Sequence, residues 1–428
     1  MKADYAFDID ERLPLKFALL YGMQWAFIMF PALIIAATLS AESFPQGQID
    51  KIRFLQFTLL TSGFFTAVQT LWGHRYPLLE GPATALMLSF ILLAPLGLPS
   101  IQGGMMMGGA LLIVIVISSQ LRRVTGFFTP NVIGVILMLI ALGLLRPLMG
   151  FMTGAGTVSP QGEGRIFLIS ISLVLFMATL SHRLKGFWKT ISILIGMLVG
   201  SLVFHFFGRL EWNRVSAAPW VSFSNQWSPS PPEFHWAAAA AFACAYLAVM
   251  VNTLGSLQGI AAITDEQRLA HAAPRGMVVS GAAGIVCGVF GVVGTVSYSM
   301  SPGVILANRV ASRFAVTSCG IILVLAAFLP KLAAFISLVP GPVVGAALCV
   351  GLGGQMGVGI RAVASQDLSS RDYFVVGLPV ILGTLAGFLP KDLFLLLPPS
   401  LQVFMANSLI IGIFLVLFLE HLLLRDRK

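Results

Sequence analysis

Residues 76–85 read Tyr-Pro-Leu-Leu-Glu-Gly-Pro-Ala-Thr-Ala, and residues 295–304 read Thr-Val-Ser-Tyr-Ser-Met-Ser-Pro-Gly-Val. Each stretch interrupts an apolar run. Proline removes a backbone donor and glycine adds conformational freedom, so neither stretch is expected to form a continuous helix. The alternation between Thr295 and Met300 predicts a short extended strand. Pro302 would then lie in the first turn of a helix, where its missing N–H costs nothing.

The apolar runs on both sides of these breaks extend over most of the chain. Of its 428 residues, 57% are hydrophobic and only 10% are charged, a balance typical of proteins that lie in lipid. A membrane-spanning helix needs about 20 apolar residues, and such stretches recur about fourteen times between Leu15 and Leu424. The sequence therefore predicts an all-α polytopic membrane protein with fourteen transmembrane segments and short strands in segments 3 and 10. The first apolar stretch is predicted to be a retained span.

The net charge of +9 follows the loops between these stretches. With both termini in the cytoplasm, 18 of the 26 Lys and Arg residues fall on inside loops, as the positive-inside rule requires. The basicity thus predicts orientation in a bacterial inner membrane and not a nucleic-acid partner.

One long connection, residues 208–234, divides the chain into two halves with seven predicted spans each. Halves with an odd number of spans insert in opposite orientations, which is the pattern of an inverted repeat. The two broken stretches are the third segment of each half. Paired breaks at matching positions indicate a transporter's binding site, since exposed backbone at that depth is tolerated only in protein or beside a cavity. A proline kink in a packing helix is the alternative.

Chemistry other than transport has little support in the sequence. The four cysteines lie in apolar stretches without metal-ligand spacing, and the histidines are scattered near loops and span ends. No clustered nucleophile or acid–base pair is found in the spans, so neither an enzyme nor a cofactor or metal is predicted.

Several motifs together resemble the nucleobase/ascorbate transporter family, also called the xanthine/uracil permease family. In chain order they are Gln24-Trp-Ala-Phe-Ile-Met-Phe, Tyr76-Pro-Leu-Leu-Glu-Gly, Phe128-Thr-Pro-Asn-Val-Ile-Gly, Asn252-Thr-Leu-Gly-Ser, Gly303, Asn308-Arg309, Phe328-Leu-Pro-Lys and Pro340-Gly-Pro-Val-Val-Gly-Ala. The resemblance implies a core domain that holds the substrate and a gate domain that moves against it. The implied boundaries are 1–124 and 235–337 for the core, 125–207 and 338–428 for the gate, and 208–234 for an external loop.

The chain departs from the family pattern at three positions. Met300 replaces a Gln or Glu that grips the ligand, Asn252 replaces a carboxylate tied to proton coupling, and Trp25 replaces a histidine. An ionised carboxylate at mid-membrane costs about 2.5 to 3.5 kcal/mol and is retained only for a function. Ordinary proton symport through those positions is therefore not expected.

The predicted substrate-binding residues surround the two breaks. Asn252 offers one acceptor and two donors, which match the amide edge of a nucleobase, although it would also serve as polar glue between helices. Met300 would lie against a flat ring or fill a gap in the core. The full predicted set is Asn252, Tyr298, Ser299, Met300, Ser301, Thr84, Trp25 and Ile28, with Gly81, Pro82, Pro302 and Gly303 as the helix-breaking residues.

Two aromatic residues and one acid are the less certain members of this site. Tyr298 and Trp25 would stack on a ring or pack between helices. Glu80 is the only acidic residue beside either break, so it is the candidate coupling group; the alternative is a solvated carboxylate that caps the following helix.

Two functions follow from these predictions. The first is transport of a nucleobase, either a purine such as xanthine or urate, or uracil, by alternating access. The second is an anion transporter or channel of the same architecture, which the positive charge and the missing carboxylates favour. H⁺ and Na⁺ are the candidate coupling ions, and a homodimer is a candidate assembly.

Overall fold

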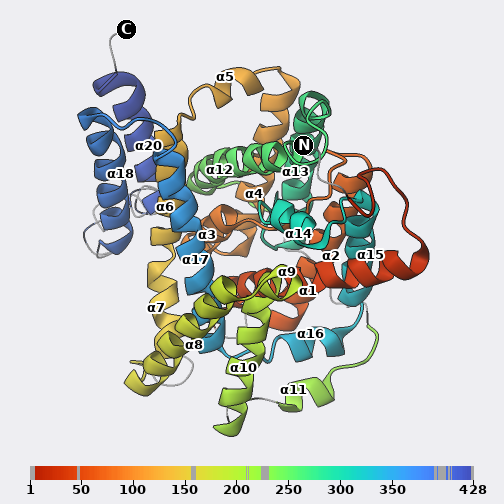
Figure 1. Ribbon diagram of the computed structural model, residues 1–428. Helices are drawn as coiled ribbons and strands as arrows, with labels where there is room; N and C mark the ends of the chain where they lie inside the picture. The colour runs from red at the N-terminus through yellow and green to blue at the C-terminus, as the bar shows by residue number, and fades with distance from the viewer. Residues whose placement is uncertain are drawn as a thin grey trace.

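The structure is a computed structural model that describes residues 5–45, 49–155, 161–208, 210, 212–222, 231–389, 393, 402, 405 and 407–425. In these ranges the regular structure is helical apart from two strands of three residues each. Figure 1 shows the helices gathered into one bundle, with segments from the two halves of the chain interleaved. The predicted external loop, 208–234, contains a short helix that the sequence did not suggest, α11 (Trp212–Ala217).

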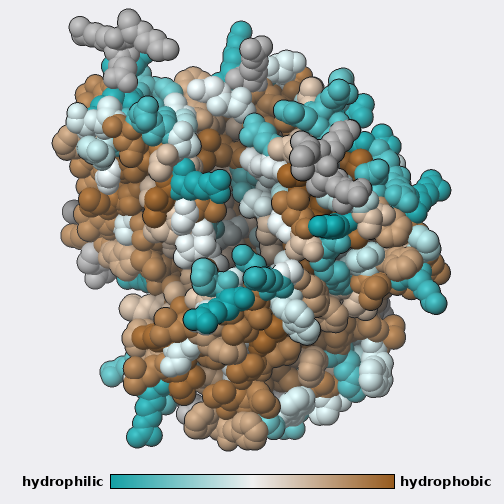
Figure 2. Space-filling view, viewed as in Figure 1, coloured by the Kyte–Doolittle hydropathy of each residue, from teal (hydrophilic) through white to brown (hydrophobic). Residues whose placement is uncertain are grey.

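Eight helices among the described residues are long and apolar enough to cross a membrane, counting α6 and α7 as one. They are α1 (Leu15–Glu42), α4 (Leu98–Ile117), α6 (Pro130–Gly143) with α7 (Leu145–Thr153), α8 (Gly164–Arg183), α12 (Trp236–Ala261), α13 (Leu269–Phe290), α17 (Gly341–Val363) and α18 (Ser370–Phe388). Together with the apolar surface in Figure 2, they confirm a helical polytopic membrane protein. The count of fourteen segments stays a prediction.

The other helices are shorter, bent or less apolar. They are α2 (Lys51–Leu71), α3 (Thr84–Leu92), η1 (Ala94–Leu96), α5 (Leu121–Thr125), α9 (Gly186–Thr190), α10 (Ser192–Phe206), α14 (Ser301–Asn308), α15 (Arg313–Ala327), α16 (Pro330–Ile336), α20 (Ser408–Phe418) and the π-helical turn η3 (Leu419–Leu423). The axes of α15 and α16 differ by 100° across Phe328 and Leu329, so these two helices form one sharply broken segment.

Both proline-containing stretches break as predicted. The first forms the strand β1 (Glu80–Pro82) and then α3, and the second forms β2 (Thr295–Ser297) and then α14. Pro302 lies in the first turn of α14, as predicted. The two strands pair antiparallel, with Glu80 opposite Ser297 and Pro82 opposite Thr295, so each half of the chain supplies one strand.

Three helix pairs pack so closely that only glycine fits where they cross. A Cβ added to Gly63 on α2 would lie 2.6 Å from the carbonyl oxygen of Gly320 on α15, and one added to Gly320 would lie 2.6 Å from that of Gly63. Gly109 on α4 and Gly281 on α13 show the same relation at 2.5 and 2.7 Å, as do Gly134 on α6 and Gly359 on α17 at 2.6 and 2.9 Å. Close approach through small residues is the usual means of helix association in membranes.

A buried polar network joins α6 to α18 and η3. Asn131 donates from Nδ2 to Asp372 at 2.8 Å and to Glu420 at 3.4 Å, while Gln366 donates to the Asn131 Oδ1 at 2.8 Å. Arg371 pairs with both carboxylates, at 3.1 Å to Asp372 and 3.2 Å to Glu420. The Phe-Thr-Pro-Asn motif therefore holds three separate elements together through Asn131.

Candidate functional site

The two-stranded sheet lies in the middle of the bundle, and all six of its residues are buried. Its ladder extends at both ends, because Ala83 donates to the Gly294 carbonyl and Tyr298 donates to the Leu79 carbonyl, each at 2.9 Å. Neighbouring helices hold its outer edges: Ser256 on α12 donates to the Ser297 carbonyl at 2.9 Å. Pairing of the two strands gives hydrogen-bond partners to backbone groups that lack helical partners because the prolines and glycines interrupt the helices.

Glu80 carries the acidic side chain of this sheet and is completely buried. Thr66 on α2 fixes its backbone, since the hydroxyl accepts from the Glu80 N–H at 3.1 Å and donates to the Glu80 carbonyl at 3.2 Å. Ser297, directly opposite on β2, donates from Oγ to Oε1 of Glu80. The alternative reading of Glu80 as a solvated helix cap is wrong, because pairing of the strands draws the carboxylate into the protein.

His74 is a buried neighbour of Glu80 that the sequence did not indicate as part of the candidate site. Its side chain is fully buried, and its Nε2 lies 3.6 Å from Oε1 of Glu80. Its Nδ1 accepts from the Tyr76 N–H at 3.0 Å, so in the neutral ring the proton is on Nε2 and faces Glu80. The sequence signal was its position six residues before Glu80, at the entrance to the first break.

Gln69 on α2 and Gly276 on α13 hold His74 in place. Gln69 accepts from the His74 N–H at 3.3 Å and donates to the Gly276 carbonyl at 2.9 Å. A Cβ on Gly276 would approach the His74 Cβ to 3.1 Å, closer than ordinary contact. The His74–Glu80 pair is thus built by α2, α13 and β1 together.

The structure places the predicted substrate residues in two groups. Asn252 on α12 and Thr84 at the start of α3 are half-buried, whereas Ser299, Met300 and Gly303 around the start of α14 are exposed. Met300 is 44% exposed, so it does not fill the core. These residues lie beside the sheet, and part of the side chain or backbone of each is accessible at the surface of the protein.

The other predicted residues are enclosed by protein. Trp25 and Ile28 are buried on α1, with 2% and 3% of their surface exposed. Ser301 is fully buried, its hydroxyl accepts from the Leu79 N–H at 3.3 Å, and its own N–H donates to the Tyr298 carbonyl at 3.2 Å. These residues support the sheet and the start of α14.

Tyr298 closes the sheet on one side. Its ring lies over Gly81, where a Cβ would collide with it, and its hydroxyl donates to the Pro82 carbonyl at 3.3 Å. On the neighbouring helix, Gly259 approaches Pro302, whose ring carbon would be 3.7 Å from an added Cβ. Gly81 therefore gives room to an aromatic ring, whereas a Cβ at Gly259 would make only ordinary contact with the first turn of α14.

An open surface continues from α14 to the other group of helices. Figure 2 shows the molecule hollowed between α14 and α17. On α17 four exposed glycines have no atom within 4 Å of an added Cβ, and Gly255 on α12 and Gly303 on α14 have the same free space. These residues are Gly351, Gly353, Gly354 and Gly357. These glycines thus leave open the surface of α17, as Gly255 and Gly303 do on α12 and α14.

Solved structures share this fold at low sequence identity. The transmembrane domain of the cyanobacterial bicarbonate transporter BicA superposes with a TM-score of 0.63 at 16% identity, covering 87% of this chain and 96% of that one. The murine anion transporter Slc26a9 in its inward-facing state gives 0.59 at 13% identity, covering 94% and 68%. The chain therefore shares the fold of these two membrane transporters, and in it two broken segments meet at a polar site.

Residues 16–392 match the permease family of xanthine and uracil permeases, and the chain belongs to that family. Its relatives include the uric acid permease PucK of Bacillus subtilis, 26% identical over 92% of both chains. The uric acid transporter UacT of Escherichia coli is 22% identical over 95% of this chain and 86% of its own. The uracil permease of Escherichia coli is 25% identical over 87% and 85%.

Proposed function

We propose that this protein is a secondary transporter that moves a nucleobase, a purine such as xanthine or urate, or uracil, across the bacterial inner membrane by alternating access. The observation that carries this proposal is the family match over residues 16–392, together with relatives named for uric acid and uracil. The buried sheet between two broken segments supports the transport part, because such breaks form binding sites in transporters.

The same proposal includes fourteen segments in two inverted repeats of seven. The described helices and strands can be counted as fourteen segments if β1–α3 and β2–α14 are the third and the tenth. An inverted repeat would relate the second segment to the ninth and the fourth to the eleventh. The Gly63–Gly320 crossing would then correspond to the Gly281–Gly109 crossing, and both show matching close approaches.

The proposed core domain comprises residues 1–124 and 235–337, and the proposed gate comprises 125–207 and 338–428. Packing supports this division: α2 and α1 pack on α15, and α4 packs on α12 and α13, whereas α17 packs on α6 and α8 and α18 packs on α20. We propose that the substrate binds where the exposed start of α14 faces the glycines of α17.

Within that site, neutral groups would recognise the ring. The Asn252 amide would pair with an amide edge of the nucleobase, and Met300 would lie against its face through a polarizable sulfur. Ser299 would add a hydroxyl and a backbone amide beside them. Truncation of a hydrogen-bonding partner leaves a polar group on the ring unpaired, so Asn252 would carry much of the specificity.

Coupling is proposed to run through Glu80 and His74, with H⁺ preferred over Na⁺. Glu80 would bind and release the coupling proton, the Nε2–H of His74 would face its ionised form, and the hydrogen bond from Ser297 on β2 would respond to the change in charge. A buried carboxylate responds strongly to protonation, because its ionised form is poorly solvated. Tyr76, Gln69 and Thr66 surround this pair from the loop and from α2, and β2 contacts it through Ser297.

The test is uptake of radiolabelled xanthine, urate and uracil into proteoliposomes. We expect saturable uptake of at least one ring, reduced about tenfold or more by Asn252→Ala, in line with the loss of one or two hydrogen bonds. The control is Ser365→Ala, at an exposed residue just after the end of α17, which should leave uptake unchanged. Electrogenic chloride or bicarbonate flux without nucleobase uptake would reject the nucleobase proposal in favour of anion transport.

A further inference from the structure

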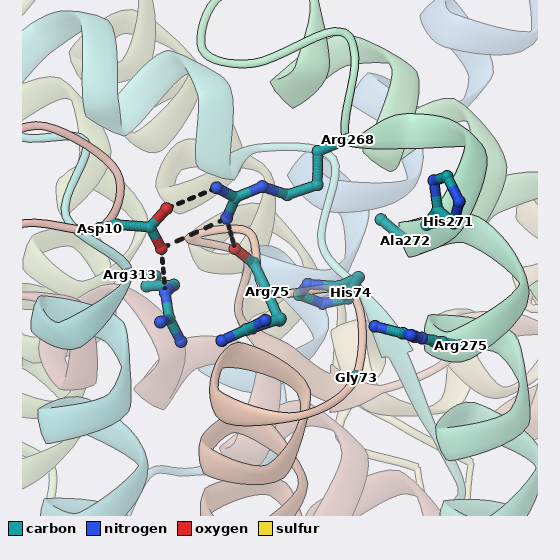
Figure 3. Close-up of a pocket in the computed structure, with 9 residues that line it drawn as sticks. All are labelled: Asp10, Gly73, His74, Arg75, Arg268, His271, Ala272, Arg275 and Arg313. Atoms are coloured by element: carbon teal, nitrogen blue, oxygen red, sulfur yellow. Dashed lines mark hydrogen bonds and ion pairs between the residues drawn. The ribbon is translucent and has the colours of Figure 1, made fainter.

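A polar cavity of about 250 Å³ lies beyond the sheet, where the end of α2 meets the starts of α13 and α15. Figure 3 shows its lining. The residues that line it are Asp10, Gly73, His74, Arg75, Arg268, His271, Ala272, Arg275 and Arg313. With the histidines neutral, four arginines face one carboxylate, so the cavity carries a surplus of positive charge.

Two of the arginines are held by partners within the protein. Arg268 binds the Asp10 carboxylate at 2.5 Å and donates to the Arg75 carbonyl at 2.9 Å. Arg313 binds the other oxygen of Asp10 at 2.7 Å and donates to the Thr70 carbonyl at 2.7 Å. The carboxylate of Asp10 shows that the cavity can hold an oxyanion between two guanidinium groups.

The other two arginines lack such a partner. Arg75 and Arg275 are exposed, and no hydrogen bond or ion pair to either guanidinium is found in the part of the chain that the structure describes. In Figure 3 no dashed line reaches these two groups, and Arg275 extends toward His74. Like charges gathered in one cavity repel each other, and an anion between them would remove that repulsion.

The backbone of Arg75 is also held in an unusual conformation. Its φ is +60°, a left-handed value that is strained for a long side chain. Its N–H donates to the Gln69 carbonyl at 2.9 Å, and its carbonyl accepts from Arg268, so both sides of the residue are fixed. The surrounding structure thus fixes the backbone from which the Arg75 side chain projects.

We propose that this cavity binds a small phosphate-bearing anion through Arg75 and Arg275, with His271 as an additional donor. Guanidinium groups bind phosphate oxygens in pairs, which favours a tetrahedral oxyanion over chloride. A cavity of 250 Å³ is slightly smaller than the about 300–1,000 Å³ that is typical for drug-sized ligands, so it suits a compact anion. This site does not depend on which ring the protein transports.

The position of His74 links this anion site to the sheet. His74 lines the cavity and its Nε2 faces Glu80, which in turn accepts from Ser297. An anion beside Arg275 would therefore change the electrostatic potential at the pair that lies under the substrate site. The site is placed to regulate the transporter from outside its substrate cavity.

The test is thermal unfolding of the purified full-length protein in neutral detergent, titrated with sodium phosphate against sodium chloride at matched ionic strength. We expect a saturable rise of the midpoint with phosphate alone. The double variant Arg75→Ala/Arg275→Ala should weaken the apparent affinity about tenfold or more, and the corresponding double lysine variant should recover part of it. Arg361→Ala, an exposed arginine at the end of α17, should behave as the unchanged protein.

The same assay separates the two sources of phosphate. Short-chain phosphatidylglycerol is compared with phosphatidylcholine of the same chain length, in the unchanged protein and in the double alanine variant. A response to phosphatidylglycerol that the double variant loses would support the site and identify a lipid headgroup as a ligand. An equal response to chloride, a full response in the double variant, or no response to either phosphate source would overturn the proposal.

Discussion

Glu80 shows how a single side chain can connect the two halves of the chain. Its oxygen Oε1 accepts from Ser297 and faces His74, while Oε2 has no hydrogen-bond partner among the described residues. A buried carboxylate needs polar groups beside it, and here one such group comes from each half of the chain. Glu80 therefore joins β1 to β2 through its side chain as well as through the strand ladder.

Glu80→Gln keeps the shape and the acceptor for Ser297 but cannot exchange a proton. We expect this variant to fold and bind nucleobase, and to lose the acceleration of uptake by an inward proton gradient. The measurement is uptake into proteoliposomes with and without that gradient. Glu42→Gln, at the end of α1 where Glu42 pairs with Lys51, is the control. A gradient response that survives Glu80→Gln would exclude Glu80 as the coupling group.

Asp10 makes stability depend on pH at the acidic end. The hydrogen bond from Arg268 holds the pKa of Asp10 below its ordinary value, with Arg313 acting in the same direction against the effect of burial. A carboxylate with a lowered pKa stabilises the fold above its ordinary pKa of about 3.9, and the contribution is lost as pH falls through the lowered value.

We therefore expect Asp10→Asn to lower the midpoint of thermal unfolding at pH 6–7, with a difference from the unchanged protein that shrinks as the buffer approaches pH 3. Asp8→Asn, two residues earlier on the same exposed segment, should have little effect at any pH. A constant difference for Asp10→Asn between pH 3 and 7 would mean that its ion pairs do not contribute.

At the scale of elements, the breaks were predictable and several boundaries were not. The proline and glycine pairs at residues 81–82 and 302–303 interrupt helical hydrogen bonding. Both interruptions, before α3 and at the start of α14, could therefore be placed from the sequence. The sequence did not indicate the division after the second break, where α14 ends at Asn308 and α15 begins at Arg313. The true division occurs at Arg309, which has a φ of +55°, and at the Ser312 cap, neither of which changes the apolar pattern.

The site was predictable to a similar extent. The sequence indicated that the two broken stretches lie together, whereas the burial of Glu80 and its contact with His74 depend on strand pairing between residues far apart in the chain. Burial of Trp25, Ile28 and Ser301 likewise depends on how helices from both halves pack. Sequence periodicity does not contain that information.

The glycine crossings bring the backbones of neighbouring helices into close contact. Gly63→Ala would place a methyl group 2.6 Å from the Gly320 carbonyl oxygen and force α2 away from α15. We expect a loss of stability of about 1–3 kcal/mol, as for other overpacked sites. Gly351→Ala on α17 has free space around its Cβ and should be neutral or slightly stabilising. Thermal unfolding of both variants in detergent measures the difference, and equal midpoints would contradict it.

At the scale of the whole molecule, alternating access requires that the start of α14 be open to one side at a time. Met300 and Ser301 are adjacent in sequence but differ sharply, since Met300 is exposed and Ser301 is fully buried. We expect Met300→Cys to react with a maleimide and to be protected by the transported nucleobase. Ser301→Cys should react slowly in both conditions. Labelling of Met300→Cys at one rate with and without nucleobase would place the substrate elsewhere.

The shared sheet also means that folding of the first half must wait until the second half has been synthesised. Glu80 precedes its partner Ser297 by 217 residues, and at about 5–20 residues per second the ribosome needs about 10–40 s to supply the second strand. During that interval the backbone of β1 has no strand to pair with, in a solvent that offers no hydrogen bonds. We expect residues 1–234 expressed alone to be degraded. Co-expression of residues 235–428 should protect them from degradation, because the second strand then becomes available to pair with β1.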